Sequence, residues 1–279
     1  MPEPPGADAP LHLASGARLR AARRLLRAKE RAETARFLAD GPQSVREALR
    51  YGVVRELIVA ADLVGKHDEL VALASAAGIP VVTATEEELA SLSEAVTPQG
   101  VVAVVDSVDV RFDITPEVAP QLVVICVQIR DPGNAGTIVR CADAFGADAV
   151  IMTTGSVELY NPKTVRASVG SIFHLPLTVG ADVDQVLRDL RGAGVQILAA
   201  DGSGADEVDQ LAADGSLSRP TAWLLGNEAW GLPAEQLALA DRVVRVPLWG
   251  KAESLNVSTA AAVCLFATAA AQRRTSPQD

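Results

Sequence analysis

Two short apolar runs near the carboxyl end of the chain each lead directly into a polar loop that contains glycine. The runs are 223–225 and 243–246, and each has the length of a buried strand. The loop after the first run contains Gly226, Glu228 and Gly231, and its glycines let the backbone turn sharply and approach a ligand closely. We therefore expect the chemistry of this protein to lie at the ends of strands.

The loop after the second run ends where an alanine-rich helix should begin. Ser254 and Asn256 fall at this border, and both residue types are favoured as helix N-caps. Taken singly, each loop is also compatible with an ordinary glycine turn or helix cap. A third polar segment, 131–140, lies upstream and carries Asn134 and Arg140 on a turn that leads into a helix. The three segments together are more informative than any one of them.

In order and spacing, these segments resemble the motifs of the SpoU (TrmH-like) RNA ribose methyltransferases of the SPOUT superfamily. The resemblance covers about residues 119–272, and the segment 161–170 also looks like the family. Residues 20–106 are more loosely similar to the substrate-binding domain that many ribosomal-RNA members carry. The matching positions are Asn134, Gly136 and Arg140 in the first motif, Gly226, Glu228 and Gly231 in the second, and Pro247, Gly250, Ser254, Leu255, Asn256 and Ser258 in the third.

The resemblance implies a fold and a cofactor. Members of the superfamily have an open α/β sheet whose carboxyl-terminal segment is threaded into a deep trefoil knot, an exception to the rule against knotted connections. In the family, S-adenosylmethionine lies among the knot loops and is held largely by backbone groups. By position, the cofactor-binding residues of this chain are Gly226, Val246, Leu248, Leu255 and Asn256.

The reaction that the resemblance implies is transfer of the methyl group of S-adenosylmethionine to a ribose 2′-oxygen. Because the sulfonium is already electrophilic, the protein has to align the hydroxyl with it and manage one proton. Arg140 is the catalytic candidate together with Asn134, while Glu228, Ser254 and Asn256 line the same site. An arginine is essentially always protonated, so a clamp on phosphate and on the developing alkoxide is favoured over a base. A salt bridge on the helix surface is the ordinary alternative for Arg140.

The net charge of −10 is unusual for a protein that binds RNA, but the basic residues are unevenly distributed. The segment 18–36 has eight basic and two acidic residues, a local charge of +6, which favours a surface that faces RNA. A solvated helix face is the alternative interpretation. The candidate RNA-binding residues are Arg20, Arg23, Arg24, Arg27, Lys163 and Arg166.

The main hypothesis is a 2′-O-methyltransferase that modifies ribosomal RNA, with 23S ribosomal RNA favoured. A transfer-RNA methyltransferase of the same family is the nearest alternative, and a non-catalytic RNA-binding or ribosome-assembly factor is the alternative from another class. Housekeeping modification and protection against an antibiotic use the same chemistry, so both stay open. Trp230 and Trp249 lie in two motif loops, where stacking on a base and packing in the core are both compatible with the sequence.

Alternating apolar runs and amphipathic segments predict two α/β domains in this chain of 279 residues. We expect a disordered tail at 1–17, an RNA substrate-binding domain at 18–106, a linker at 107–121 and a methyltransferase domain at 122–279. The first domain should begin with one amphipathic helix over 18–37. In the second, a turn at 131–136 should precede a helix that begins at Thr137, and the βαβα order predicts a parallel sheet.

No metal site, catalytic nucleophile or membrane span is expected. The cysteines Cys126, Cys141 and Cys264 and the three histidines are scattered, which suits neither a disulfide framework, a zinc site nor a catalytic triad. The longest apolar run, 260–271, is shorter than the roughly 20 residues that span a bilayer. The Pro-rich start lacks the layout of a signal peptide. We therefore expect a cytoplasmic protein, and the resemblance implies a homodimer built on the catalytic domain.

Overall fold

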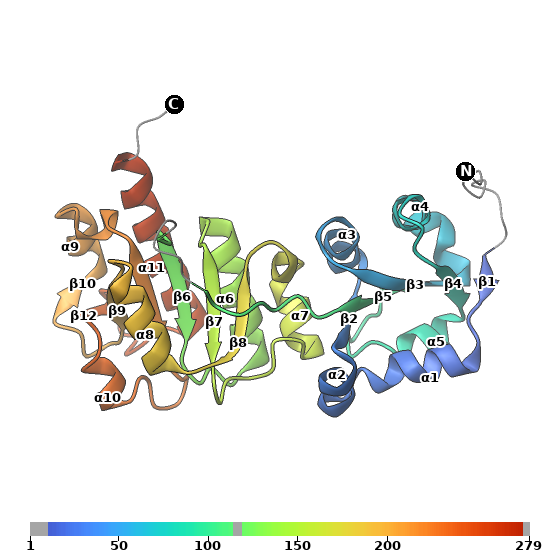
Figure 1. Ribbon diagram of the computed structural model, residues 1–279, viewed down its shortest axis with the longest axis horizontal. Coiled ribbons are helices and arrows are strands. Elements are labelled where there is room, and N and C mark those ends of the chain that lie inside the picture. The colour runs from blue at the N-terminus through green and yellow to red at the C-terminus, as the bar shows by residue number, and fades with distance from the viewer. Residues whose placement is uncertain (1–10, 114–118, 276–279) are drawn as a thin grey trace. The chain divides into compact units, whose positions relative to one another are not determined.

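A computed structural model of the chain describes residues 11–113 and 119–275. The described residues group into two compact units, each with its own sheet (Figure 1). The first unit contains the residues up to Val108 together with Tyr160–Phe173. The second contains Asp109–Leu159 and the residues from His174 onward. Residues 1–10 of the predicted tail lie outside the described residues.

The first unit has a five-stranded sheet surrounded by short helices. Its strands are β1 (His12–Leu13), β2 (Arg36–Asp40), β3 (Val54–Ala60), β4 (Val81–Ala84) and β5 (Val101–Asp106). Its helices are α1 (Gly16–Arg24), α2 (Ala28–Thr34), α3 (Pro42–Tyr51), the 3-10 helix η1 (Ala61–His67), α4 (Asp68–Ala76), α5 (Glu86–Ala90), α7 (Pro162–Ser168) and the 3-10 helix η2 (Ser171–Phe173). The strand order is β1-β4-β3-β5-β2, with β5 antiparallel to both of its neighbours.

The amino-terminal part of this unit differs from the sequence-based expectation. The single helix predicted over 18–37 is wrong, because α1 and α2 are separate helices and the chain enters β2 at Arg36. The break is stabilised by the buried side chain of Arg31, which donates to the carbonyl oxygen of Leu25 at 2.8 Å. Residues 11–17 are also ordered, because β1 pairs with β4 and Ser15 caps α1. The disordered tail predicted at 1–17 therefore includes residues that belong to β1 and to the start of α1.

The segment Tyr160–Phe173 belongs to the first unit by its contacts, although the predicted methyltransferase domain at 122–279 included it. The rings of Tyr160 and Phe173 stack on Phe37, with centroids 4.6 Å and 5.9 Å away. The Tyr160 hydroxyl also accepts a hydrogen bond from the backbone N–H of Val108 at 2.7 Å. These contacts join residues far apart in the chain, so local periodicity gave no sign of them.

The second unit has a seven-stranded sheet with the order β10-β12-β9-β11-β6-β7-β8. Its strands are β6 (Leu122–Cys126), β7 (Ala149–Thr153), β8 (Leu177–Ala181), β9 (Gln196–Ala200), β10 (Asp206–Glu207), β11 (Thr221–Leu225) and β12 (Arg242–Arg245). Its helices are α6 (Pro132–Phe145), α8 (Val183–Gly192), α9 (Val208–Ala213), the 3-10 helix η3 (Ser216–Ser218), α10 (Ala234–Leu237) and α11 (Val257–Thr275). All strand pairs are parallel, which confirms the prediction of a parallel sheet.

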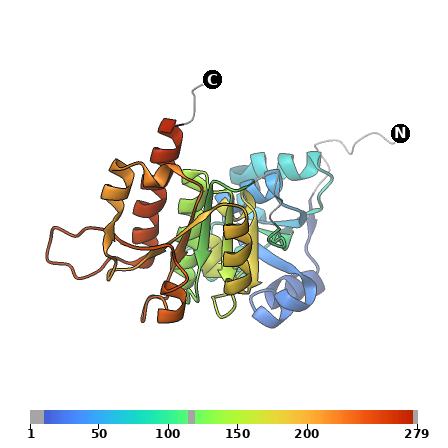
Figure 2. The ribbon, with the colours of Figure 1, turned by 60° about the vertical axis from the view of Figure 1, so that its left-hand side comes forward.

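Helices cover both faces of this sheet, as Figures 1 and 2 show for α8 and α11. Leu224 of β11 belongs to the core that α8 covers, whereas the neighbouring Trp223 donates from its indole nitrogen to Thr268 of α11 at 2.9 Å. Successive residues of a strand point to opposite faces, so β11 is buried on both sides. This central strand leads directly into the second motif loop. The knot implied by the resemblance stays a prediction.

Candidate functional site

The parallel strands of the second unit bring the three motif segments to one edge of the sheet. The segments follow β6, β11 and β12, and a pocket of about 620 Å³ lies among them. This volume is typical of small-molecule sites. Of the nine residues predicted to act in catalysis or to hold the cofactor, eight line this pocket: Asn134, Gly226, Glu228, Val246, Leu248, Ser254, Leu255 and Asn256.

A chain of hydrogen bonds joins one side chain from each motif. The amide nitrogen of Asn134 donates to Oε1 of Glu228 at 3.1 Å, and its amide oxygen accepts from Nδ2 of Asn256 at 2.9 Å. The Glu228 carboxylate also accepts from the backbone N–H groups of Arg130 and Asp131, both at 3.2 Å. Because both ends of the Asn134 amide are engaged, the network sets its orientation.

These hydrogen bonds keep Glu228 ionised. Partial burial acts to raise the pKa of Glu228, but the hydrogen bonds from Asn134 and from backbone N–H groups outweigh it, so the pKa lies below its ordinary value. A carboxylate with a lowered pKa is a weak base. Glu228 is therefore suited to orienting its neighbours rather than to removing a proton from a hydroxyl.

Asn134 owes its position to the start of α6. The side chain of Asp131 caps this helix by accepting from the backbone N–H of Asn134 at 2.8 Å. Pro132 occupies the first helical position, where a missing N–H costs nothing. The separate turn predicted at 131–136 is therefore wrong, because most of that segment is the first turns of the helix.

Asn256 is placed by the start of α11. Its side-chain oxygen accepts from the backbone N–H of Ser258 at 2.8 Å and from the Ser258 hydroxyl at 2.7 Å. This arrangement is the N-cap that the sequence predicts for Asn256. Ser254, the other predicted cap, lies before the helix and is exposed, although it lines the pocket. Asn256 thus has two tasks, since its oxygen caps the helix and its nitrogen holds Asn134.

The second motif loop is closed by its own backbone. Asn227 and Gly231 exchange two backbone hydrogen bonds of 3.0 Å and 2.9 Å, and Gly231 has a φ of 70°, which favours glycine. The side chain of Asn227 is 5% exposed and donates to the carbonyl oxygen of Gln128 at 2.7 Å. This bracing role of Asn227 was not predicted from the sequence. Its position between Gly226 and Glu228 in a tight loop was the available signal.

Two carboxylates of the pocket were also missed. Asp201 and Glu253 line it together with Arg245. The guanidinium of Arg245 is bound to Glu207 at 2.6 Å and to the carbonyl oxygen of Gly204 at 2.6 Å, so it serves to hold the neighbouring loop. The pocket therefore offers negative charge from Asp201, Glu228 and Glu253 to a cationic ligand.

Arg140 is the predicted residue that does not line the pocket. It lies on α6 six residues after Asn134, and its side chain is exposed. Six residues correspond to about 600° of helix rotation, so the two side chains project in different directions. No ion pair of Arg140 is found within residues 11–113 and 119–275, which argues against the surface salt bridge that was its alternative.

The two tryptophans of the motif loops are both exposed, so packing in the core is wrong for them. Trp230 is 53% exposed and Trp249 is 89% exposed, whereas Trp223 in β11 is fully buried. The guanidinium carbon of Arg130 lies 5.1 Å from the centroid of the Trp230 ring, a cation–π contact. Arg130 was not among the predicted residues.

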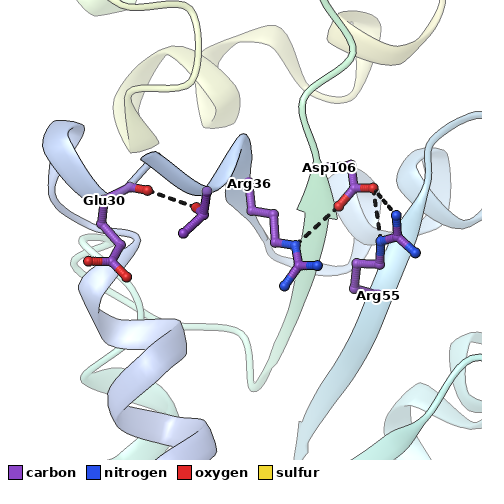
Figure 3. A network of polar contacts seen from close by, with 5 residues as sticks. Glu30, Arg36, Arg55 and Asp106 are labelled. Atoms are coloured by element: carbon purple, nitrogen blue, oxygen red, sulfur yellow. Dashed lines mark hydrogen bonds and ion pairs between the residues drawn. The ribbon is translucent and has the colours of Figure 1, made fainter. Parts of the chain in front are cut away.

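Within the basic segment 18–36, five of the eight basic side chains have partners inside the first unit. Arg31 is buried, and the others form ion pairs: Arg18 with Glu56, Arg24 with Glu30, Lys29 with Glu33, and Arg36 with Asp106. Figure 3 shows Asp106 between Arg36 and Arg55, where it accepts from Nε of each at 3.3 Å and 2.8 Å. Hydrogen bonds from Arg55 are the main cause that lowers the pKa of Asp106. Among the predicted RNA-binding arginines of this segment, Arg20, Arg23 and Arg27 are exposed and Arg24 is paired.

Arg166 and Lys163 lie on α7 in the first unit. The Arg166 side chain is half-buried, with Nη1 3.9 Å from a carboxylate oxygen of Asp40. Burial raises the pKa of Asp40, while Ser93 and Arg166 act in the opposite direction. Arg166 therefore neutralises a buried carboxylate in part, and RNA contact is a poor description of its position. Lys163 is exposed on the same helix.

Two of the three cysteines lie in the core. Cys126 and Cys264 are buried, and burial raises the pKa of each thiol to about 12.

Within the described ranges, no three His, Cys, Asp or Glu side chains are grouped as metal ligands require. Within the same ranges, none of the helices combines the length and the hydropathy that crossing a membrane needs.

Two stretches of the chain match the models of known protein families. Residues 121–266 match the SpoU rRNA Methylase family, and residues 17–103 match the MRM3-like substrate binding domain. The 23S rRNA (guanosine(2553)-2'-O)-methyltransferase RlmP of Bacillus subtilis (strain 168) is 33% identical over 242 residues, or 85% of this chain and 90% of the relative. A 23S rRNA (uridine(2479)-2'-O)-methyltransferase of Streptomyces viridochromogenes is 37% identical over 183 residues, or 64% of this chain and 62% of the relative.

The solved structures include a similar protein with a bound ligand. The AdoMet-bound rRNA methyltransferase from Sinorhizobium meliloti superposes with a TM-score of 0.78 at 30% identity. The superposition covers 95% of this chain and 98% of that one, so it includes both units.

Proposed function

Because the chain belongs to the SpoU rRNA Methylase family, we propose that it transfers the methyl group of S-adenosylmethionine to a ribose 2′-oxygen of RNA, with 23S ribosomal RNA as the substrate. The hydrogen-bonded set of Asn134, Glu228 and Asn256 at the common pocket carries the proposal. A factor that only binds RNA has no use for a small-molecule pocket built by three converging loops, so an enzyme is favoured. The two named relatives favour ribosomal over transfer RNA.

The pocket fits S-adenosylmethionine, which supplies an electrophilic methyl group on its sulfonium when bound. Apolar side chains and loop backbone provide the flat, partly apolar surroundings that an adenine requires. The carboxylates of Asp201, Glu228 and Glu253 oppose the positive charge of the sulfonium and the amino group. We assign the backbone contacts to the residues predicted from the sequence: Gly226, Val246, Leu248, Leu255 and Asn256.

The protein's own groups then have to position the ribose hydroxyl and stabilise charge on it. Asn134 and Glu228 form the rigid polar wall of the site, and the lowered pKa of Glu228 gives it an orienting role. Arg140 is the group that would hold a phosphate and the developing alkoxide, because its guanidinium stays protonated and presents several N–H donors. Ser254, exposed beside the pocket, is a further contact to the hydroxyl or the cofactor in this proposal.

We also propose that the site is completed by a second copy of the chain. Arg140 is exposed and does not line the pocket of its own chain. On α11, Val263 and Phe266 remain 36% and 60% exposed, and the Phe266 ring contacts Phe145 of α6 edge to face at 5.8 Å. Helix α6 also carries Arg140. Exposed apolar residues on α11, which packs against the helix that carries Arg140, favour a symmetric interface between two copies, and we propose that this interface brings each Arg140 to the partner's pocket.

The first unit is the RNA-binding domain in this proposal, and its exposed arginines give a test. Replacing Arg20, Arg23 and Arg27 together with alanine should weaken RNA binding and make its salt dependence shallower, by roughly 0.7 to 0.9 in log–log slope for each phosphate that is no longer neutralised. Arg24→Ala is the matched control, because Arg24 lies in the same segment but is paired with Glu30. Fluorescence anisotropy with a ribosomal RNA fragment at several salt concentrations measures both effects. Equal salt-dependence slopes for the triple variant and the wild type would show that the segment 18–36 does not bind RNA and is an ordinary solvated surface.

The double task of Asn256 predicts two separable defects. Asn256→Ala should lower the free energy of unfolding by about 1 kcal/mol through loss of the cap, and should reduce cofactor affinity and methyl transfer because Asn134 loses its anchor. Asn256→Ser retains a capping oxygen but not the amide that donates to Asn134. We expect it to recover stability without recovering transfer. Denaturant unfolding and single-turnover rates distinguish the two effects, and full recovery of transfer by serine would contradict the proposed contact.

The proposed function itself is tested by incubating the protein with labelled S-adenosylmethionine and unmodified ribosomal or transfer RNA, then mapping the methylated ribose. Transfer to a 2′-oxygen of 23S ribosomal RNA is the expected result. Transfer to transfer RNA alone would assign the alternative substrate. Cofactor binding without transfer to either RNA would overturn the proposal.

A further inference from the structure

The indole of Trp230 is exposed to solvent beside the proposed reaction site. It is 53% exposed and lies two residues after Glu228 in the loop that follows β11. The buried Trp223 shows what a tryptophan in this unit contributes to the core, where its indole nitrogen is also hydrogen-bonded. Trp230 makes no comparable contribution, so packing does not explain its presence.

The loop that carries Trp230 is braced on both sides of the residue. The backbones of Asn227 and Gly231 are joined by two hydrogen bonds, and the Asn227 side chain accepts from the N–H of Ala229 at 2.8 Å. The same side chain donates to Gln128, which ties the loop to the end of β6. A side chain on a braced backbone loses little conformational freedom when a ligand binds, so Trp230 is prepared for contact.

Arg130 fixes the surroundings of the ring. Its guanidinium lies 5.1 Å from the ring centroid, and its backbone N–H donates to Glu228 at 3.2 Å. Arg130 and Trp230 are therefore both tied to Glu228, one by a hydrogen bond and the other by the chain. The guanidinium covers part of the ring, and the exposed half of the residue leaves room for a second flat group. A permanent positive charge stands next to that room.

An aromatic surface with an adjacent guanidinium matches the chemistry of an unpaired RNA nucleotide. Single-stranded bases are bound by stacking on aromatic rings, and the phosphate next to them is bound by basic side chains. We propose that Trp230 and Arg130 form a stacking site for one unpaired base of the RNA, at or next to the methylated nucleotide, with Arg130 contacting its phosphate. This inference rests on the proposed function, because it assumes an RNA ribose beside Glu228.

Trp230→Ala should raise the dissociation constant of the RNA by about 5- to 150-fold, the usual range for losing one base–aromatic stack. Cofactor affinity should stay unchanged, because Trp230 does not line the pocket. Trp230→Phe should recover most of the RNA affinity, since it keeps an aromatic face. Trp249→Ala is the matched control: this residue is a more exposed tryptophan on the next loop, without an arginine over its ring in the part of the chain that the structure describes. We expect it to bind RNA within about twofold of the wild type.

Arg130→Gln tests the charge without disturbing Glu228, because the hydrogen bond to Glu228 comes from the backbone. It should lower the log–log salt slope of RNA binding by about one. Stacking is read directly with an RNA whose mapped target or neighbouring base is 2-aminopurine: its fluorescence should be quenched by the wild type and by Trp230→Phe, but not by Trp230→Ala. Unchanged RNA affinity and quenching in Trp230→Ala, with an active wild type, would overturn this inference alone. A wild type that methylates no RNA would instead overturn the proposed function.

Discussion

Replacing Arg140 with alanine is expected to slow methyl transfer by roughly 100-fold or more, the usual scale for losing one group that stabilises charge in the transition state. Affinity for S-adenosylmethionine should stay nearly unchanged, because Arg140 does not line the pocket. Its exposed position on α6 also means that folding should be little affected. Single-turnover rates at saturating RNA and cofactor, with calorimetric cofactor affinity, measure the two quantities separately.

Arg140→Lys separates charge from geometry. Lysine keeps the positive charge but lacks the planar group of N–H donors that can hold a phosphate and the hydroxyl at once, so only partial recovery is expected. Arg188, exposed on α8 of the same unit, offers a control because Arg188→Ala removes an equal charge on another helix. Wild-type transfer by Arg140→Ala would remove Arg140 from the mechanism and make Glu228 the leading candidate.

The same variant tests whether the site is shared between two chains. Arg140→Ala can be mixed, after unfolding and refolding together, with a variant that has Arg140 but a damaged pocket. If each Arg140 serves the partner's pocket, half of the dimers gain one intact site, and the mixture should reach about one quarter of the wild-type rate. If Arg140 serves its own pocket, mixing should restore no activity. A monomer with full activity at micromolar concentration would contradict the dimer directly.

The parts of this protein that the sequence predicted well share a physical cause. Asn134, Glu228 and Asn256 lie in the segments that follow the parallel strands β6, β11 and β12, and parallel strands bring their carboxyl ends to one edge of a sheet. A residue that caps a helix is also predictable, because capping depends on only a few neighbouring residues. The order of strands and loops along the chain was therefore enough to predict most of the residues that line the pocket.

The errors arose where distant contacts decide the role of a side chain. Arg166 looked like a phosphate ligand because of its charge, but its half-buried side chain lies 3.9 Å from the carboxylate of Asp40, a residue far away in the sequence. Arg31 is buried because it closes the break between α1 and α2, a role that no periodicity assigns to an arginine. The bracing role of Asn227 likewise depends on Gln128 in another loop. Such contacts are properties of the folded chain and not of a segment.

Gly226→Ala should weaken binding of S-adenosylmethionine by about 5- to 150-fold, the range that corresponds to an overpacking cost of roughly 1–3 kcal/mol. A Cβ at this position would lie 2.5 Å from the carbonyl carbon of Gly231 and 2.6 Å from the nitrogen of Leu232. Both are backbone atoms, so no side chain can rotate away. The loop has to open, which breaks the hydrogen bonds between Asn227 and Gly231 and moves Glu228 from Asn134.

The matched control for this change is Gly192→Ala at the end of α8, where an added Cβ would meet no atom within 4 Å. It makes the same chemical change in the same unit and should leave cofactor affinity unaltered. Thermal unfolding should show that Gly226→Ala remains folded, because the strain falls on a loop that can move. Calorimetry with S-adenosylmethionine then isolates the binding defect. This variant also supplies the damaged pocket for the mixing experiment with Arg140→Ala, which is run at a cofactor concentration that saturates the wild type but not Gly226→Ala. Wild-type affinity in Gly226→Ala would show that cofactor binding does not depend on the closed form of this loop, and would contradict the assignment of Gly226 to the cofactor site.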